Sequence, residues 1–381
     1  MKQIRLFGKN RSFSPKKMKW MLSAVISFLC FLLVLAIAGR ISSTQDTQQM
    51  AERWSDKKNV AQVSAFFSRD ADITQNDIIS FEHTLDTVLQ EASITIEAEN
   101  PDARLWADAY SASGKIDISS EQSSVTADAI GIGGDFFLFH PLKLVGGSYF
   151  SGNDINKDYC VIDEEAAWKL FGSSDVAGMF VYVNDTPLMV SGVVERPEGR
   201  LEEAAGLDGT VVYVSYELLD SYVNGDNGNH IEINHYEIVM PNPVSGFALQ
   251  KVQEHLSADE REVEYLQNTN RYSLKRCLEL LLAFGTRSMN GKAILYPYWE
   301  NIARGYEDIL ALVTLLLLLL LLYSVVVVLV LFIIWWRHKG WTIKSVLIKL
   351  KDKIDRMREK NYAKRRNKKA RKAKPDAELI E

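Results

Sequence analysis

Residues 309–336 read ILALVTLLLLLLLLYSVVVVLVLFIIWW, 28 consecutive positions without a charged side chain. About 20 helical residues cross the hydrocarbon core of a bilayer, so this run predicts a membrane-spanning helix. Near the N-terminus, residues 21–39 form a second uncharged run, of 19 positions. Together the two runs exclude a soluble enzyme and predict a chain that crosses the membrane twice.

The N-terminal run has the basic start of a cleaved signal peptide, which is the alternative to an anchor. Its apolar stretch is longer than the roughly 7–15 residues of a signal-peptide core. It ends at Ala38, Gly39 and Arg40, and only residues 36–38, Ala-Ile-Ala, offer a weak cleavage site. We therefore expect an uncleaved anchor.

Charged residues are segregated around these two runs. Residues 1–20 carry seven Lys and Arg and no acid, and residues 337–381 carry 17 basic against six acidic residues. The rest of the chain holds 20 basic and 43 acidic residues, a net charge of −23. Since basic flanks stay on the cytoplasmic side, we expect both termini in the cytoplasm and the acidic middle outside the plasma membrane.

Short strand and helix patterns fill the middle of the chain. A strand at 60–68 precedes a helix that starts at Thr74-x-x-Asp77 and ends near residue 92. After a turn-rich stretch, the order strand, helix, strand returns at 231–240, 244–256 and 262–266. Between these units, strand composition dominates. The additional expected elements are strands at 94–97, 105–110, 115–119, 124–130, 159–162, 179–183 and 188–194, and helices at 164–171 and 271–284.

The predicted fold class is an α+β extracytoplasmic domain, with split βαβ halves and an inserted β-rich subdomain, between two transmembrane helices. We expect a stalk because residues 42–58 continue the helical spacing and lack Gly and Pro. The expected segments are a basic cytoplasmic N-terminus (1–19), membrane helix 1 (20–41), a helical stalk (42–58), a βαβ-type porter-like subdomain (59–113 and 230–268), the inserted subdomain (114–229), a juxtamembrane helical segment (269–307), membrane helix 2 (308–336) and a cytoplasmic amphipathic helix with a basic tail (337–381).

Three motifs have residue types that are found in binding sites. Residues 131–134, Gly-Ile-Gly-Gly, have the wrong spacing for a phosphate loop, and the 381 residues contain no Gly-x-x-x-x-Gly-Lys-Ser/Thr. Residues 224–230 lack the acidic spacing of a calcium loop. We expect a turn at each. His230-x-Glu232-x-x-His235 suggests metal ligands, but on a strand residues 230 and 232 share one face and residue 235 the other. We expect a solvated strand edge there, and no catalytic, cofactor-binding or metal residues anywhere in the chain.

The three cysteines give little functional information. Cys30 lies in the first span, Cys160 in an expected strand and Cys277 in an expected helix. A Cys160–Cys277 disulfide is possible on the oxidising side of the membrane, but nothing in the sequence positions the pair. We favour two buried free thiols.

Three ordered segments have a distinctive sequence: GDFFLFHPLKLVGGSYFSGND at 134–154, VIDEEAAWKLFGSSDVAG at 161–178 and LMVSGVV at 188–194. In this order and spacing they resemble the MacB-like periplasmic core domain of FtsX-type ABC transporter permeases. The resemblance covers roughly residues 18–268. It implies an external domain that converts ATP-driven motion of membrane helices into work on a substrate or partner outside.

The usual permease of that family has one span before the external domain and three after it, whereas one follows it in this sequence. The resemblance therefore implies a permease-like subunit of an ABC-type export or mechanotransmission complex, with a separate ABC ATPase and a second membrane subunit or homodimer partner. The alternative is a membrane-anchored extracellular binding, receptor or scaffold protein without a transport role. An external enzyme is disfavoured because no residue set would carry the chemistry.

The basic tail has an apolar stripe at helical spacing, formed by Ile343, Val346, Leu347, Leu350, Ile354 and Met357. The stripe predicts an interfacial helix over 341–358, held by anionic lipid, and then a mobile basic run over 364–374. The alternative is that the stripe docks on an ATPase or another cytoplasmic partner. Nucleic-acid binding is not expected, because the basic cluster lacks aromatic residues and belongs to a membrane protein.

Overall fold

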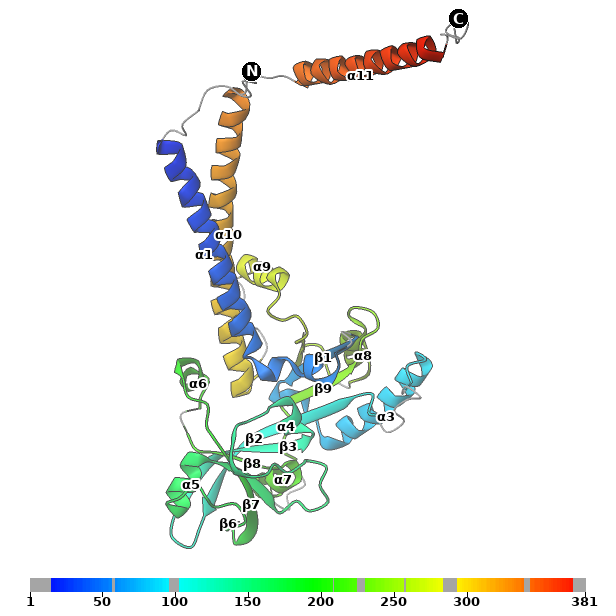
Figure 1. Cartoon of the computed structure of the whole chain (residues 1–381). Coiled ribbons are helices and arrows are strands. Elements are labelled where there is room, and N and C mark those ends of the chain that lie inside the picture. Colours follow the sequence, from blue (N-terminus) through cyan, green and yellow to red (C-terminus); the bar gives the residue numbers. More distant parts are fainter. Residues whose placement is uncertain are drawn as a thin grey trace, which may run out of the picture. The chain divides into compact units, whose positions relative to one another are not determined.

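The computed structural model describes residues 15–56, 59–95, 103–207, 209–224, 230–256, 258–283, 293–338 and 343–372 (Figure 1). The chain divides into two compact units. The larger unit is Leu33–Leu317, and the smaller unit combines Met1–Leu32 with Leu318–Glu381. The division falls within two long helices, α1 (Pro15–Ser43) and α10 (Tyr298–His338), which belong partly to each unit.

The larger unit is an α+β domain whose described strands all join one sheet. The order is β10-β1-β9-β2-β3-β8-β5-β7-β4, and β6 pairs with β2 and β7. Most neighbours are antiparallel, while β3 and β8, and β5 and β7, run parallel. The strands are β1 (Val60–Phe67), β2 (Ala107–Ser119), β3 (Ser124–Gly134), β4 (Leu144–Gly147), β5 (Tyr159–Asp163), β6 (Phe180–Val183), β7 (Thr186–Val194), β8 (Val211–Ser215), β9 (His235–Pro241) and β10 (Val263–Gln267).

Short helices connect these strands. Those of the larger unit are η1 (Asp46–Gln48), α2 (Met50–Trp54), η2 (Arg69–Ala71), α3 (Gln75–Glu91), α4 (Phe136–Phe139), α5 (Glu164–Phe171), α6 (Arg200–Ala204), α7 (Tyr216–Asn224), α8 (Phe247–His255) and α9 (Leu274–Leu282). The expected helix after Thr74 is confirmed: the side chains of Thr74 and Asp77 form a capping box at its start. The expected helix at 164–171 is confirmed too, since Asp163 caps its first turn and Gly172 ends it at φ 71°.

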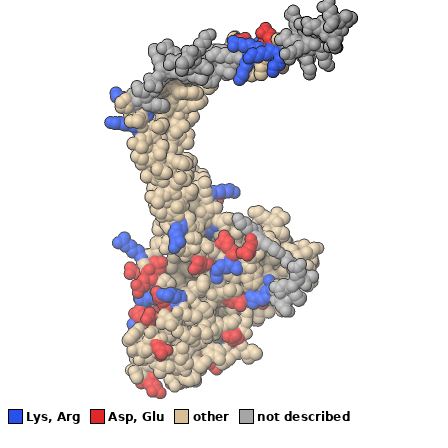
Figure 2. Space-filling view, in the orientation of Figure 1, with Lys and Arg blue, Asp and Glu red and all other residues tan. Residues whose placement is uncertain are grey.

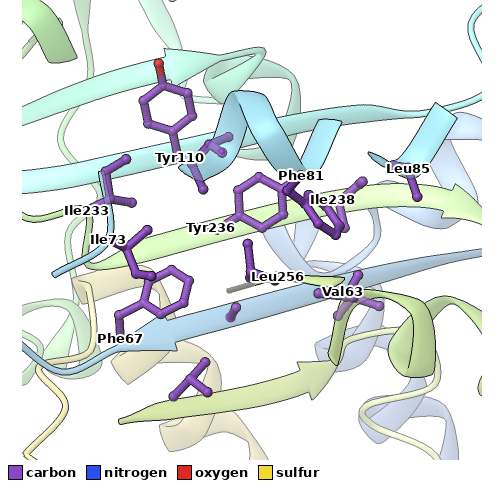
Figure 3. Close-up of a cluster of buried hydrophobic side chains, with 14 of the residues drawn as sticks. Val63, Phe67, Ile73, Phe81, Leu85, Tyr110, Ile233, Tyr236, Ile238 and Leu256 are labelled. Atoms are coloured by element: carbon purple, nitrogen blue, oxygen red, sulfur yellow. The ribbon is translucent and has the colours of Figure 1, made fainter. Parts of the chain in front are cut away.

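Helices α3 and α8 cover one face of the sheet's first half. Strand residues alternate between faces, so Val63 and Phe67 of β1 and Tyr236 of β9 point to these helices and into one core. Figure 3 shows Phe81 of α3 reaching this core; its ring meets that of Tyr236 edge-on at 5.7 Å. The opposite face of β1 and β9, which carries residues 62, 64, 235 and 237, is also buried.

The two predicted subdomains share a sheet. Strand β2 passes without a break through the boundary expected at 113/114, and it pairs with β3 from Ala109↔Gly134 to Ser119↔Ser124. The two strands expected at 105–110 and 115–119 are therefore one. Gly114, between them, leaves room for α7, because a Cβ there would lie 3.3 Å from the Leu219 side chain.

The predicted stalk is not one helix. Helix α1 ends at Ser43, and residues 46–54 form η1 and α2 instead. The side chains of Thr44 and Gln49 donate hydrogen bonds to two carbonyl oxygens in the last turn of α1, those of Ile41 and Ser42. Such local side-chain bonds compete with helix continuation, which explains the break. The segment expected at 269–307 likewise consists of α9 and the start of α10, with residues 284–292 outside the described set.

The smaller unit holds residues 15–32 of α1 and residues 318–338 of α10. Both helices are long and apolar enough to cross a membrane. Small polar side chains join them: Ser27 Oγ donates to Leu320 O at 3.0 Å, and Ser324 Oγ to Ala24 O at 3.3 Å. On the face shown in Figure 2, uncharged side chains cover these helices between their ends, and Lys and Arg side chains lie near the ends. Helix α11 (Ile343–Lys372) extends beyond the expected 341–358, so much of the basic run predicted to be mobile is helical.

Candidate functional site

A set of buried polar side chains lies inside the larger unit, between η1, β1, β9 and the first turns of α10. Charged side chains are rarely buried unless they are paired, so this set calls for a structural explanation. We call it the buried network. Its members are Gln48, Gln62, Ser64, His140, His235, Glu237, Asn268, Arg271, Glu300 and Glu307, each at most 5% exposed.

Arg271 forms one end of the buried network. It lies between β10 and α9, and its guanidinium donates to both Glu300 carboxylate oxygens at 2.7 and 2.8 Å. It also donates to Glu307 Oε1 at 2.8 Å and to Gln48 Oε1 at 2.7 Å. Burial alone would lower the pKa of Arg271, but the two carboxylates outweigh burial and raise it. Arg271 is therefore a permanent cation between η1 and α10.

Arg304 extends this end of the network along α10. Its Nε donates to Glu300 at 2.6 Å and its Nη2 to Glu264 of β10 at 2.8 Å. Glu300, Arg304 and Glu307 lie three or four residues apart, which places them on one face of the helix. The first turns of α10 thus contact β10 and the segment that follows it through five charged side chains, those of Glu264, Arg271, Glu300, Arg304 and Glu307.

Glu237 forms the other end of the network. Its Oε1 accepts hydrogen bonds from Gln62 Nε2 at 2.6 Å, Ser64 Oγ at 2.7 Å and Asn268 Nδ2 at 2.9 Å. Burial alone would raise the pKa of Glu237, but its contacts with His140, His235 and Ser64 lower it to about 2. The carboxylate is therefore ionised at neutral pH.

Two histidines face the free oxygen of this carboxylate. His140 Nε2 lies 3.0 Å and His235 Nε2 3.8 Å from Glu237 Oε2. Burial lowers the pKa of His235 to about 4, so this imidazole is neutral. The ring of Trp299, from the first turn of α10, lies over both histidines, with centroids 4.5 Å from His140 and 5.3 Å from His235.

Backbone hydrogen bonds connect the Arg271 end of the buried network to its Glu237 end. Asn268 N donates to Gln62 O, and Arg271 N donates to Asn268 O, each at 2.9 Å. Gln62 also holds the turn after α1, because its side chain accepts from Met50 N at 2.8 Å and donates to Thr47 O at 2.7 Å. The buried network therefore joins the sheet both to α10 and to the segment that follows α1. Such an arrangement fixes these elements to one another and offers no surface for a substrate.

The motif at 230–235 is split in the structure. His230 is exposed and pairs with Asp220 at 2.8 Å. His235 is fully buried, so the expectation of a solvated strand edge is wrong for it, because β9 lies between β1 and β2. The sequence analysis did not identify His140, which is distant from His235 in the chain. It also did not identify Glu237, although the His235-x-Glu237 spacing places His235 and Glu237 on one face of the strand.

The structure also bears on the two turns expected at 131–134 and 224–230 and on the cysteines. Residues 131–134 end β3 and are not a turn; Gly133 is needed there because a Cβ would lie 1.9 Å from Tyr110 Cζ. In the turn expected at 224–230, residues 225–229 lie outside the described residues. Cys160 of β5 and Cys277 of α9 are buried free thiols.

A family model described as "MacB-like periplasmic core domain" matches residues 21–254. Among curated proteins, the macrolide export ATP-binding/permease protein MacB of Chromobacterium violaceum is 39% identical over 74 residues, 19% of this chain and 12% of that protein. The protein of that name from Neisseria meningitidis serogroup B is 34% identical over 112 residues, 29% of this chain and 17% of that protein. The chain thus spans less than a fifth of the length of these relatives.

Two solved structures resemble parts of this chain. The periplasmic region of MacB from Actinobacillus actinomycetemcomitans has 18% identity and a TM-score of 0.38, covering 57% of this chain and 92% of that one. The extracellular domain of the noncanonic ABC-type transporter YknZ from Gram-positive bacteria has 16% identity and a TM-score of 0.35, covering 55% of this chain and 100% of that one.

Proposed function

This chain belongs to the family of the MacB-like periplasmic core domain, and from that membership we propose that it is a permease-like membrane subunit of an ABC-type export or mechanotransmission complex. It is a membrane protein with an extracytoplasmic domain, given its family and its two apolar helices. Both termini are assigned to the cytoplasm, because the basic blocks at 1–20 and 337–381 flank the spans.

The buried network is the observation that best supports a mechanical role. Helix α10 is continuous from Tyr298 to His338, and its first turns are held to the sheet by Glu300, Glu307 and Trp299. Breaking a buried ion pair costs about 3–5 kcal/mol. A displacement of α10 would therefore move β1 and β9 with it, instead of being absorbed in a loop.

The energy source in this proposal is a separate protein. The 381 residues contain no P-loop motif; in this proposal an ABC ATPase subunit supplies the nucleotide site. A second membrane subunit or a second copy of this chain completes the transmembrane part. The basic helix α11 contacts anionic lipid at the cytoplasmic surface.

Purification of the tagged chain from its native membranes, after mild crosslinking, tests this proposal. We expect an ABC ATPase and a membrane protein, or a dimer of this chain, to co-purify. The ATPase activity of the purified complex in nanodiscs should fall when this chain is removed from the complex. It should return when the chain is added back. Recovery of the chain with neither an ATPase nor a membrane partner would contradict the proposal and favour an anchored receptor or scaffold.

A further inference from the structure

The carboxylate and two imidazoles of the buried network are arranged like ligands around a metal ion. We propose that His140, His235 and Glu237 form a binding site for a divalent transition-metal ion of the zinc type. Their ligand atoms all lie within 4.8 Å of one another, and the three side chains are at most 2% exposed. Neither the family nor the function proposed above calls for this site.

The two separations measured from the Glu237 carboxylate are close to those between the ligands of a zinc ion. Zinc binds imidazole nitrogen and carboxylate oxygen at about 2.0–2.2 Å in tetrahedral geometry, which places neighbouring ligand atoms roughly 3.3 Å apart. The observed separations from Glu237 Oε2, 3.0 Å to His140 Nε2 and 3.8 Å to His235 Nε2, lie on either side of that value. Two histidines and one glutamate are also a ligand set that zinc uses, with the fourth position open to water.

The polar atoms that face one another are otherwise unsatisfied. Among the described residues, Glu237 Oε2 and both ring nitrogens of His140 and of His235 have no hydrogen-bond partner. The 3.0 Å contact between His140 and Glu237 therefore lacks the angles of a hydrogen bond. A buried polar group without a partner costs about 1–3 kcal/mol. One ion would satisfy three of these atoms together.

The surroundings hold the ligands in place. Gln62, Ser64 and Asn268 all bind Glu237 Oε1 and leave Oε2 directed at the imidazoles. Such outer contacts orient the ligands of metal sites. Phe136 lies 4.6 Å from the His140 ring and Phe66 5.2 Å from the His235 ring, so the imidazoles are packed between aromatic groups.

A bound ion would connect two segments that are far apart in the chain. His140 follows α4 in the connection between β3 and β4, while His235 and Glu237 belong to β9. Trp299 of α10 lies over both imidazoles. The metal would therefore stabilise the junction at which α10 meets the sheet, so zinc should raise the unfolding temperature of the domain.

The test uses the full chain in detergent, without a polyhistidine tag, stripped with a chelator and reloaded with zinc. We expect one zinc per chain after desalting, and a visible absorption band of four-coordinate Co²⁺ when cobalt replaces zinc. His140→Gln and His235→Gln should each weaken zinc binding by more than about 100-fold, since changing even an outer contact costs 10–100-fold. His230→Gln, in the exposed histidine nearby, is the matched control and should bind zinc as the wild type does.

Two results would overturn the site. No retained zinc and no cobalt band in the wild-type chain would mean that His140, His235 and Glu237 contact one another without holding a metal. Equal zinc binding by all three histidine variants would mean adventitious surface binding. If the buried variants fail to fold, X-ray absorption of the zinc-loaded wild type decides instead: two imidazoles in the first shell support the site, and a shell without imidazole rejects it.

Discussion

Arg271 holds Glu300 through two parallel hydrogen bonds, although each side chain is only 1% exposed and the residues lie 29 positions apart. A fork-to-fork pair of this kind fixes orientation as well as distance. It therefore locks the first turn of α10 to the segment between β10 and α9. Because both side chains are buried, removal of either one would leave the other charge uncompensated, so the contact is sensitive to substitution.

Loss of the Arg271 cation should destabilise the larger unit. Arg271→Gln leaves Glu300 and Glu307 buried without their shared counter-charge, at a cost of about 3–5 kcal/mol. Urea unfolding of the full chain in detergent, followed by tryptophan fluorescence, measures this change. Arg271→Lys should recover only part of the loss because an ammonium cannot form the two-bonded contact.

Arg261 offers the matched control. It pairs with Asp259 at 2.7 Å, but its side chain is 86% exposed. Arg261→Gln should leave the unfolding midpoint unchanged, since exposed ion pairs contribute little. Equal destabilisation by the two variants would show that the burial of Arg271 is not what makes its contacts important.

A flexible insertion should uncouple the membrane helices from the sheet. Four Gly-Ser residues after Thr47 would separate η1 from the Gln62 side chain, which now donates to Thr47 O at 2.7 Å. We expect normal expression and membrane localisation with loss of complex activity, measured as stimulation of the co-purified ATPase. The same insertion between Glu121 and Gln122, in the exposed β2–β3 connection, is the control. Unchanged activity with the Thr47 insertion would mean that this segment is only a tether.

Gly133 should not tolerate a side chain. An added Cβ would lie 1.9 Å from Tyr110 Cζ, so Gly133→Ala forces the ring to move, at a cost of about 1–3 kcal/mol. Tyr110→Ala should also destabilise, but the double variant should be more stable than the sum of the two effects predicts. Additive losses in a double-mutant cycle of urea unfolding would contradict this contact.

The core beneath α3 should depend on Phe81. Its ring is buried against Tyr236, so Phe81→Ala should cost about 3–5 kcal/mol. Ile79, on the same helix, is 42% exposed, and Ile79→Ala should have a much smaller effect. Similar losses for the two variants, measured by thermal unfolding, would mean that α3 does not pack as described.

Helix α11 should lie on anionic lipid. Leu350 and Ile354 are exposed in the smaller unit, and changing both to Ala removes apolar area while keeping the basic charge. In nanodiscs with anionic lipid, the wild-type tail should resist trypsin and the double variant should be cut faster. In neutral nanodiscs both should be cut alike. Unchanged protection together with loss of the ATPase partner would favour protein docking instead.

The membrane spans and the main secondary structure follow from sequence patterns. A charged side chain is too costly in hydrocarbon, so the uncharged runs at 21–39 and 309–336 were sufficient to locate both apolar helices. The expected helix starting after Thr74 and the helix at 164–171 were also found, because capping residues and turn glycines act within a few residues of themselves. The family match at 21–254 agrees with the segments that carried the resemblance.

The buried network depended on the tertiary structure. Gln62 and Ser64 in β1, and His235 and Glu237 in β9, alternate with apolar residues, a pattern typical of a strand with one face in water. That face is buried here because α4 and the first turn of α10 bring His140 and Trp299 over it. Alternation reports which residues share a face, but whether that face meets water depends on segments far away in the chain, and only folding brings these together.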